Sequence, residues 1–141
     1  MNSVTIETSQ TTGITVVRLP IEPFTAPRMV RSDKWARRSC VVSYYESRNQ
    51  LYEIGKKFFD PLPAAFDVVF HISMPNSWSE KKKKEFDGKP HQQRPDRDNL
   101  LKALQDTFCG DDAYIHDGRV KKVWSRIGMI EVKYSKEGEL N

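Results

Sequence analysis

The order of its predicted elements indicates that this 141-residue chain forms one α+β domain. Runs of β-branched and aromatic residues mark the strands, while capping residues, glycines and prolines mark where helices begin and end. Read from the N-terminus, these signals give the order β-α-β-α-β-β. Residues 13–134 are expected to hold all of these elements, between a flexible segment at 1–12 and a polar tail at 135–141.

The first half of the chain predicts one strand and one long helix. Gly13–Leu19 has the composition of a strand, and the prolines at positions 20, 23 and 27 end it. Ser32 or Asp33 can cap a helix that runs to about Phe59. A further pair of prolines shortly after that position stops the helix.

The second half predicts a strand, a helix and two closing strands. Ala65–Met74 is dense in β-branched and aromatic residues and is the strongest strand candidate. Pro75–Pro95 reads as a long polar loop, a length that is usually functional or disordered. A helix is expected from Arg97 to about Cys109, ended by the next glycine. Strands follow at Gly118–Ile127 and Met129–Tyr134, turned at the glycine between them.

The overall composition is that of a soluble globular protein, with 38% hydrophobic and 30% charged residues. Lys and Arg number 23 against 19 Asp and Glu, for a formal net charge of +4. This mild excess permits a nucleic-acid partner but does not require one. No apolar run approaches the length of a membrane span, so no membrane association is expected.

The N-terminus and the cysteines indicate a cytoplasmic protein. The first residues lack the basic and then apolar pattern of a secretory signal. Cys40 and Cys109 are the only cysteines and have no metal-ligand spacing. Both are therefore expected to be reduced thiols.

Charged side chains gather around the predicted second helix. Asp96 and Asp98 lie at its start, Lys102 lies one turn beyond Asp98, and Asp111 and Asp112 follow its end. Asp98 and Lys102 share a face because they are four residues apart, and the apolar residues fall on the other side: Leu100, Leu101, Leu104 and Phe108. Mg²⁺ takes one or two carboxylates together with water and phosphate oxygens, and it promotes phosphodiester hydrolysis. The grouping therefore favours a Mg²⁺-dependent nuclease in which Lys102 contacts a phosphate oxygen.

Each part of this pattern also has an ordinary structural explanation. An Asp before a helix is usually its N-cap, and acids in the first turn are favoured by the helix dipole. Asp98 and Lys102 can form a surface ion pair worth only about 0.2–0.5 kcal/mol. Gly110-Asp111-Asp112 can be a simple turn. Spacing alone therefore leaves the metal site as a hypothesis.

The same residues resemble a known family. The segment Pro95-Asp96-Arg97-Asp98-Asn99-Leu100-Leu101-Lys102-Ala103-Leu104-Gln105-Asp106, followed by Gly110-Asp111-Asp112, is similar to the RusA family of Holliday-junction resolvases. The stretch from Met74 to Lys83, with Gly88-Lys89-Pro90-His91, resembles the phage-type branch of that family. The segment Lys122-Val123-Trp124 is similar to the closing part of the family pattern. The similarity covers about residues 65–134.

The resemblance implies a RusA-like fold, a small mixed sheet packed with two helices, and an endodeoxyribonuclease activity. Family members are homodimers that need Mg²⁺, for which Mn²⁺ can substitute, and nick four-way DNA junctions symmetrically in recombination and repair. The setting would be the cytoplasm of a bacterial or phage-infected host cell. By position, Asp96, Asp98 and Asp112 match the metal-binding aspartates and Lys102 matches the catalytic lysine, with Asp111 as an alternative ligand.

One departure from the family pattern concerns the start of the helix. Pro95 and Arg97 stand where other members can carry a basic and an apolar residue. The local DNA contacts and any preference for a cleavage sequence are therefore left open.

A basic stretch precedes the acid cluster. Between His71 and Arg97 there are seven basic and four acidic residues, a net charge of +3. The basic residues are Lys81, Lys82, Lys83, Lys84, Lys89, Arg94 and Arg97. They are candidate DNA contacts, because lysines and arginines beside a metal site can neutralise phosphates. Stacking or sugar-phosphate contacts are expected from Trp78, His91, Gln92 and Gln93. A lysine run alone is ordinarily only a solvated surface.

The remaining polar residues leave alternatives open. His71, His91 and His116 have no zinc spacing, and each is expected to be a packed or surface histidine, with His91 as a weaker candidate for a general base. Asp106 lies on the face of Lys102 and is either its partner or a surface acid. Other functions are a metal nuclease for flaps, other branched DNA or RNA, a non-catalytic DNA-binding module, and a protein-interaction domain.

Overall fold

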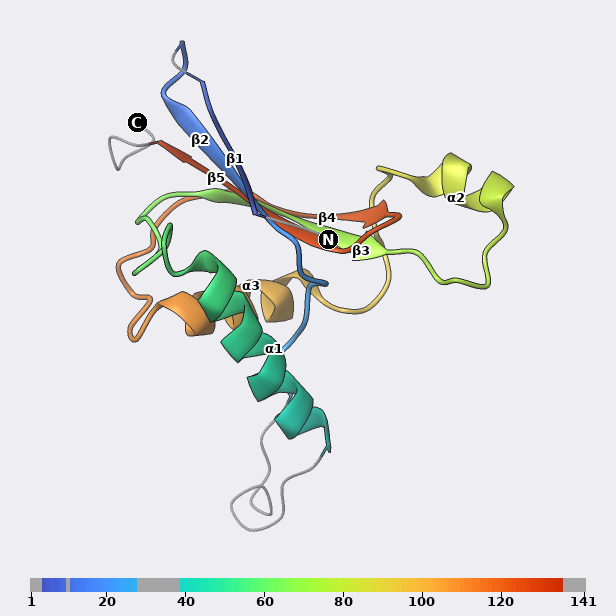
Figure 1. The fold of residues 1–141 in the computed structure, drawn as a ribbon, viewed down its shortest axis with the longest axis horizontal. Helices are drawn as coiled ribbons and strands as arrows, with labels where there is room; N and C mark the ends of the chain where they lie inside the picture. Colours follow the sequence, from blue (N-terminus) through green and yellow to red (C-terminus); the bar gives the residue numbers. More distant parts are fainter. Residues whose placement is uncertain (1–3, 10, 28–38, 136–141) are drawn as a thin grey trace.

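The computed structural model describes residues 4–9, 11–27 and 39–135. Within these ranges the elements follow in the order β1 (Thr5–Thr8), β2 (Ile14–Leu19), α1 (Ser39–Gly55), β3 (Asp67–Ser73), α2 (Glu80–Phe86), α3 (Arg97–Phe108), β4 (Val120–Ser125) and β5 (Met129–Ser135). Helices α1 and α3 lie on one side of the sheet, and α2 stands apart on an arm beyond the ends of β3 and β4 (Figure 1). The predicted α+β class is confirmed.

The sheet is mixed and has the strand order β1-β2-β5-β3-β4. Strands β3 and β4 are parallel, and the other neighbouring pairs are antiparallel. Strands β4 and β5 are consecutive in the chain, yet β3 lies between them. The short connection from Ser125 to Met129 therefore crosses the end of β3, which places the start of the arm and the end of β4 side by side.

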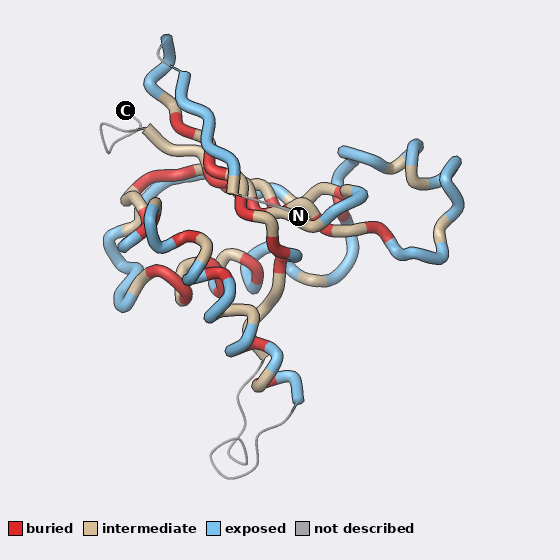
Figure 2. The backbone as a smooth tube through the Cα atoms, in the orientation of Figure 1, coloured by how far each residue is buried: buried red, intermediate tan, exposed pale blue. Residues whose placement is uncertain are grey.

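Alternate residues of the central strands form rows that face the helices. The rows are Val17–Val132–Val68 and Leu19–Ile130–Phe70, all of them buried. Leu51 of α1 and Leu100 and Leu104 of α3 belong to the same buried cluster, and Figure 2 shows buried positions on the sheet and on these two helices. Fully burying a side chain of this size stabilises the fold by about 1.5–3 kcal/mol. This layer therefore holds α3 against the sheet.

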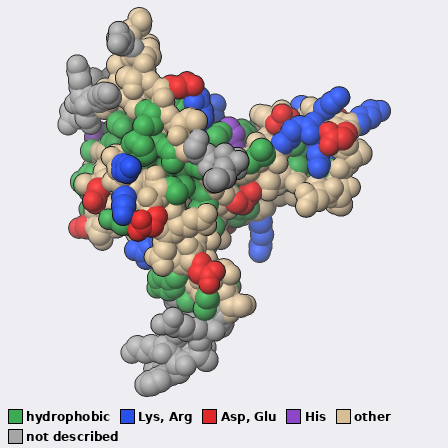
Figure 3. Space-filling model, viewed as in Figure 1, with side chains coloured by type: hydrophobic (Ala, Val, Ile, Leu, Met, Phe, Trp, Pro, Cys, Tyr) green, Lys and Arg blue, Asp and Glu red, His purple; other side chains and the backbone are tan. Residues whose placement is uncertain are grey.

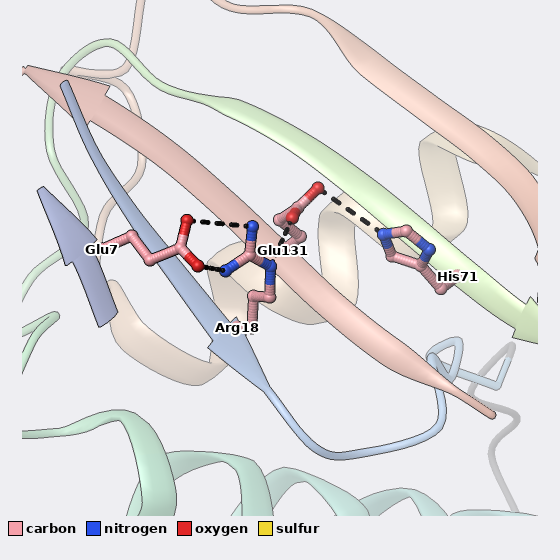
Figure 4. A network of polar contacts seen from close by, with 4 residues as sticks. All are labelled: Glu7, Arg18, His71 and Glu131. Atoms are coloured by element: carbon pink, nitrogen blue, oxygen red, sulfur yellow. Dashed lines mark hydrogen bonds and ion pairs between the residues drawn. The ribbon is translucent and has the colours of Figure 1, made fainter. Parts of the chain in front are cut away.

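The opposite face of the sheet carries a chain of charges (Figure 4). Arg18 Nη1 lies 3.0 Å from Glu7 Oε1, and Arg18 Nε donates to Glu131 Oε2 at 2.8 Å. The hydrogen bond with Glu7, more than the contact with Glu131, raises the pKa of Arg18. His71 Nε2 lies 3.5 Å from Glu131 Oε1 and forms no hydrogen bond. His71 is half-buried, and it lies on the face of the sheet away from the helices.

The predicted order β-α-β-α-β-β lacked one strand and one helix. Strand β1 lies within the segment 1–12, and it pairs with β2 from Thr5 to Thr8, a long-range contact that its polar composition does not indicate. Helix α2 lies within the predicted loop, where Ser79 Oγ accepts a hydrogen bond from Lys82 N at 3.2 Å. Lysine and glutamate are good helix formers once such a cap is present.

The long helix was predicted to end too late. It ends at Gly55, whose carbonyl accepts hydrogen bonds from the backbone N–H groups of Phe58 and Phe59 at 2.9 and 3.0 Å. A Cβ at Gly55 would lie 2.5 Å from Cζ of Phe108, so α1 and α3 meet closely there. The capping positions proposed at Ser32 and Asp33 lie outside the described residues.

The remaining predicted elements are confirmed within a few residues at their ends. Cys40 and Cys109 are free cysteines. None of the helices in the described part of the chain is long and apolar enough to cross a membrane.

Candidate active site

Helix α3 presents two carboxylates at its start. Asp96 has the extended backbone of an N-cap residue, φ −71° and ψ 144°, but its side chain makes no capping hydrogen bond. Its carbonyl accepts from Leu100 N at 3.2 Å, so the backbone alone starts the helix. Asp98 follows in the first turn, and both residues are exposed. Neither carboxylate has a hydrogen-bond or ion-pair partner among the described residues.

The middle of α3 separates an apolar face from a charged one. Leu100, Ala103, Leu104 and Phe108 are buried, whereas the Lys102 side chain is 63% exposed. Lys102 Nζ lies 3.3 Å from Asp106 Oδ2. Lys102 therefore forms its ion pair with Asp106 and not with Asp98.

Helix α1 supports this pair from the side. Arg48 Nη2 donates to the carbonyl of Asp106 at 2.8 Å. The hydroxyl of Tyr44 is buried, and burial raises its pKa, with Arg48, Asp106 and Lys102 acting as weaker electrostatic influences. Helix α1 therefore contacts the charged face of α3 near Asp106, while Asp98 and Lys102 stay exposed.

The two aspartates of the loop after α3 have different hydrogen-bond partners. Asp111 Oδ1 accepts a hydrogen bond from Ala113 N at 3.0 Å, as in a turn. Asp112 Oδ2 accepts from Gln105 Nε2 at 2.8 Å, which ties the loop back to α3. The loop is also anchored at Tyr114, whose hydroxyl donates to Leu62 O at 2.6 Å. Burial and the contact with Cys109 raise the pKa of Tyr114.

The structure contains no preformed cluster of these acids, and the predicted metal site stays a prediction. No group of three or more His, Cys, Asp or Glu side chains within residues 4–9, 11–27 and 39–135 is placed to hold a metal. The carboxylate of Asp112 is bound to the side chain of Gln105 on α3. The two carboxylates at the start of α3 nevertheless suit Mg²⁺, which commonly takes one or two carboxylates and keeps its remaining sites for water and phosphate.

A lysine of β4 fastens the segment before α3. Lys122 Nζ donates to the carbonyls of Gln93 at 2.6 Å and Pro95 at 2.7 Å. The carbonyl of Lys122 accepts from His91 N at 3.0 Å. The backbone that leads into Asp96 is thus tied to the edge of the sheet.

A hollow of about 510 Å³ opens beside the first of these carboxylates. It is lined by Thr25, Arg94, Pro95, Asp96 and Asn99. Thr25 comes from the connection after β2, and the other four come from the start of α3 and the segment before it. The lining offers a cation, hydroxyl and amide groups and a carboxylate, which suits a sugar-phosphate better than an apolar ligand.

The arm carries most of the basic stretch. Helix α2 has no buried residue, and Lys81, Lys82 and Lys84 are exposed while Lys83 is half-buried. In Figure 3 Lys and Arg side chains gather over this arm. Arg126 Nη1 lies 2.9 Å from Glu80 Oε2 and joins the arm to the end of β4.

Aromatic side chains pack the base of the arm. Trp78 lies 4.8 Å from Trp124 and 5.3 Å from Phe86 between ring centroids, and Lys82 Nζ lies 4.1 Å from the centroid of Trp78. His91 is only 4% exposed, and its ring centroid lies 4.3 Å from that of Trp124. Burial, and then the charge of Lys122, lowers the pKa of His91. The expected nucleic-acid contact by His91 is therefore wrong for this arrangement, and a packed histidine is confirmed.

Several residues of the site were missed from the sequence: Thr25, Arg48, Gln105, Tyr114 and Lys122. Of these residues, Lys122 could have been found from the sequence pattern. Val120, Lys122 and Trp124 alternate on the face of β4 that looks toward the helices, and a lysine in such a position needs polar partners. Tyr114 carried no such signal, because its partner Leu62 is 52 residues away, and Gln105 carried none, because its partner lies in the loop beyond the end of α3.

Exposed carboxylates and a lysine on one helix, beside a basic arm, are features of enzymes that hydrolyse nucleic-acid phosphodiesters. A comparison of the sequence with known protein families identifies the class of enzyme. Residues 21–134 match the family model of the endodeoxyribonuclease RusA. The match spans most of the chain, so this protein belongs to the RusA endodeoxyribonuclease family. No curated protein matches it significantly.

Proposed function

We propose that the protein is a Mg²⁺-dependent endodeoxyribonuclease that resolves four-way DNA junctions by paired symmetric nicks. The observation that carries this proposal is the pair of exposed carboxylates of Asp96 and Asp98 at the start of α3, which have no partner among the described residues and the first of which lines the 510 Å³ hollow. Membership of the RusA family supports the nuclease activity.

Asp96 and Asp98 would hold the metal ion, and Asp112 is the third proposed ligand. The hydrogen bond from Gln105 occupies one oxygen of the Asp112 carboxylate. A Mg²⁺ ion held there would supply positive charge to the phosphate and would lower the pKa of a coordinated water. Asp96 and Asp98 keep two negative charges exposed at this point, which is costly near a phosphate unless a cation is shared between them.

Lys102 is the proposed catalytic lysine. Its ammonium contacts a non-bridging oxygen of the phosphate and stabilises negative charge that develops there. Asp106 restricts the position of this ammonium through the 3.3 Å ion pair, and Arg48 fixes the backbone of Asp106 from α1. The lysine is therefore presented by a helix that is held on two sides.

The basic arm is the proposed contact for DNA outside the catalytic centre. Lys81, Lys82 and Lys84 face solvent on α2, and Lys89, Arg94 and Arg97 are exposed between α2 and the first turn of α3. A row of cations from the arm to the acids can follow a phosphate backbone and release its counterions. Two copies of the chain are needed for two symmetric cuts, so a homodimer is part of the proposal.

Junction cleavage by wild type and an Asp98→Asn variant tests the proposal. We expect wild type to nick a four-way junction in Mg²⁺ at symmetric positions, and Asp98→Asn to bind the junction with unchanged affinity and not to nick it. The matched control is Asp60→Asn, the same change at an exposed aspartate outside α3. Normal nicking by Asp98→Asn would refute the assignment.

A linear duplex, a flap and an RNA junction are assayed alongside the four-way junction. Faster cleavage of the flap or the RNA would replace junction resolution with another metal-nuclease activity. Binding without nicking at any Mg²⁺ or Mn²⁺ concentration would indicate a DNA-binding module.

A further inference from the structure

We infer that Lys122 is a positioning residue for the catalytic acids: it holds the segment 93–95 so that Asp96 and Asp98 point toward the metal and the phosphate. The inference rests on the proposed function for the role of the acids. The contact between Lys122 and the segment 93–95 does not depend on the proposed function, because it consists of hydrogen bonds within the chain.

Lys122 reaches this segment from β4, the edge strand of the sheet. It lies opposite Phe70 in the parallel pairing of β3 and β4, on the face of the sheet that α3 covers. Its own carbonyl accepts from His91 N at 3.0 Å, and Pro90 bridges to Val123. Backbone and side chain of one residue thus tie two points of the chain before α3 to the sheet.

The ammonium group makes the tie next to the acids. Nζ donates to Gln93 O at 2.6 Å and to Pro95 O at 2.7 Å, and Pro95 precedes Asp96 directly. Hydrogen bonds from a charged donor are stronger than neutral ones. Asp96 itself is exposed, so packing does little to hold it. On the other side Asp96 is held by the Leu100 N–H. The position of Asp96 is therefore set by one bond from the helix and by the Lys122 ammonium.

A phosphate contact is the competing role for a lysine in a basic protein. Two of the three ammonium protons of Lys122 are already donated to carbonyls, and the side chain is half-buried. Its neighbour Lys121 is exposed and lies opposite Val69, on the other face of the sheet. Lys121 therefore provides a matched control in which a lysine is removed from the same strand while these bonds are kept.

The experiment compares wild type with Lys122→Met, Lys122→Arg and Lys121→Met. Methionine keeps most of the length of the side chain and removes its donors. Five quantities are measured: amide hydrogen exchange of residues 91–98, Mn²⁺ affinity of the free protein by calorimetry, junction affinity without metal, and kcat and KM for nicking. Urea unfolding of each variant identifies a general loss of fold.

In Lys122→Met we expect faster amide exchange in the segment 91–98. Mn²⁺ affinity and kcat should be lowered by about 10–100-fold, as for other groups that orient metal ligands. KM and junction affinity should stay within about twofold of wild type. Lys122→Arg should restore a large part of kcat, since it keeps a charged donor, and Lys121→Met should behave as wild type in exchange and kcat. Unchanged exchange in Lys122→Met, or a defect confined to junction affinity, would overturn the inference. A wild-type protein that neither binds Mn²⁺ nor nicks would instead overturn the proposed function, and the exchange data would still decide whether Lys122 holds the segment.

Discussion

Gln105 Nε2 lies 2.8 Å from Asp112 Oδ2 and links the loop after α3 to the face of that helix. Gln105 is one turn from Leu101 and three residues from Lys102, so the bond brings Asp112 to the helix that carries the other proposed catalytic residues. Asp111 faces its own loop, where its carboxylate accepts from Ala113 N. The two neighbouring acids therefore have different structural partners, and the proposed function assigns the catalytic role to Asp112.

The first prediction separates these two aspartates. Asp112→Asn should lower kcat for junction nicking by more than about 100-fold, because removing a ligand costs more than removing a group that only orients one. Asp111→Asn keeps an oxygen that can accept from Ala113 N and should lower kcat by less than about fivefold. Single-turnover nicking at saturating junction measures both. A larger defect in Asp111→Asn than in Asp112→Asn would reverse the assignment.

The second prediction concerns the anchor of the same loop. Tyr114→Phe removes the donor to Leu62 O and should reduce the free energy of unfolding by about 1 kcal/mol, with up to about 3 kcal/mol if the carbonyl is left without water. Tyr45→Phe is the control, because Tyr45 is 46% exposed. Urea unfolding at neutral pH measures the difference. Equal stabilities for the two variants would show that the anchor contributes nothing.

The third prediction is a pH dependence due to His91. Burial lowers its pKa in the folded protein below the ordinary value of 6.5. As the pH falls through about 6.5, the unfolded chain takes up a proton before the folded protein does, so His91 makes stability decrease toward lower pH. His91→Gln should flatten the decrease between about pH 7 and pH 5. The exposed His116→Gln variant is the control, and thermal unfolding across this range gives the slopes. A slope unchanged by His91→Gln would contradict the lowered pKa.

The fourth prediction concerns the arm. Replacing Lys81 and Lys84 by Gln should weaken junction binding and reduce the slope of log affinity against log salt concentration by up to about 2, one for each phosphate that the variant no longer neutralises. Charge reversal of all four lysines from 81 to 84 should have a larger effect in the same direction. Lys56→Gln with Lys57→Gln removes the same charge from the two exposed residues that follow the end of α1, and should leave the slope unchanged. Equal slopes for the two double variants would exclude the arm from the DNA interface.

Local patterns along the chain were enough to predict most of the elements. Apolar spacing and the acidic start predicted α3 within one residue, and β-branched runs predicted β2, β3, β4 and β5. These predictions succeed because helix period, strand composition and capping act over a few neighbouring residues. Strand β1 and the end of α1 at Gly55 were not predictable in this way, since pairing with β2 and packing on Phe108 determine them.

In the candidate site, too, some features follow from the local sequence and others only from the tertiary structure. The sequence by itself determined which residue types are present, with Asp96, Asp98 and Lys102 spaced on one helix, and it determined the family. Only the tertiary structure decided that Lys102 pairs with Asp106, that Gln105 holds Asp112, and that a lysine of β4 holds the segment before α3. The physical reason is that hydrogen bonds and ion pairs are formed by whichever groups the sheet and its helices bring together. The bonds of Lys122 span 29 and 27 residues, and the bond from Gln105 to Asp112 spans seven residues across the end of α3, so neither follows from the periodicity of a single helix or strand.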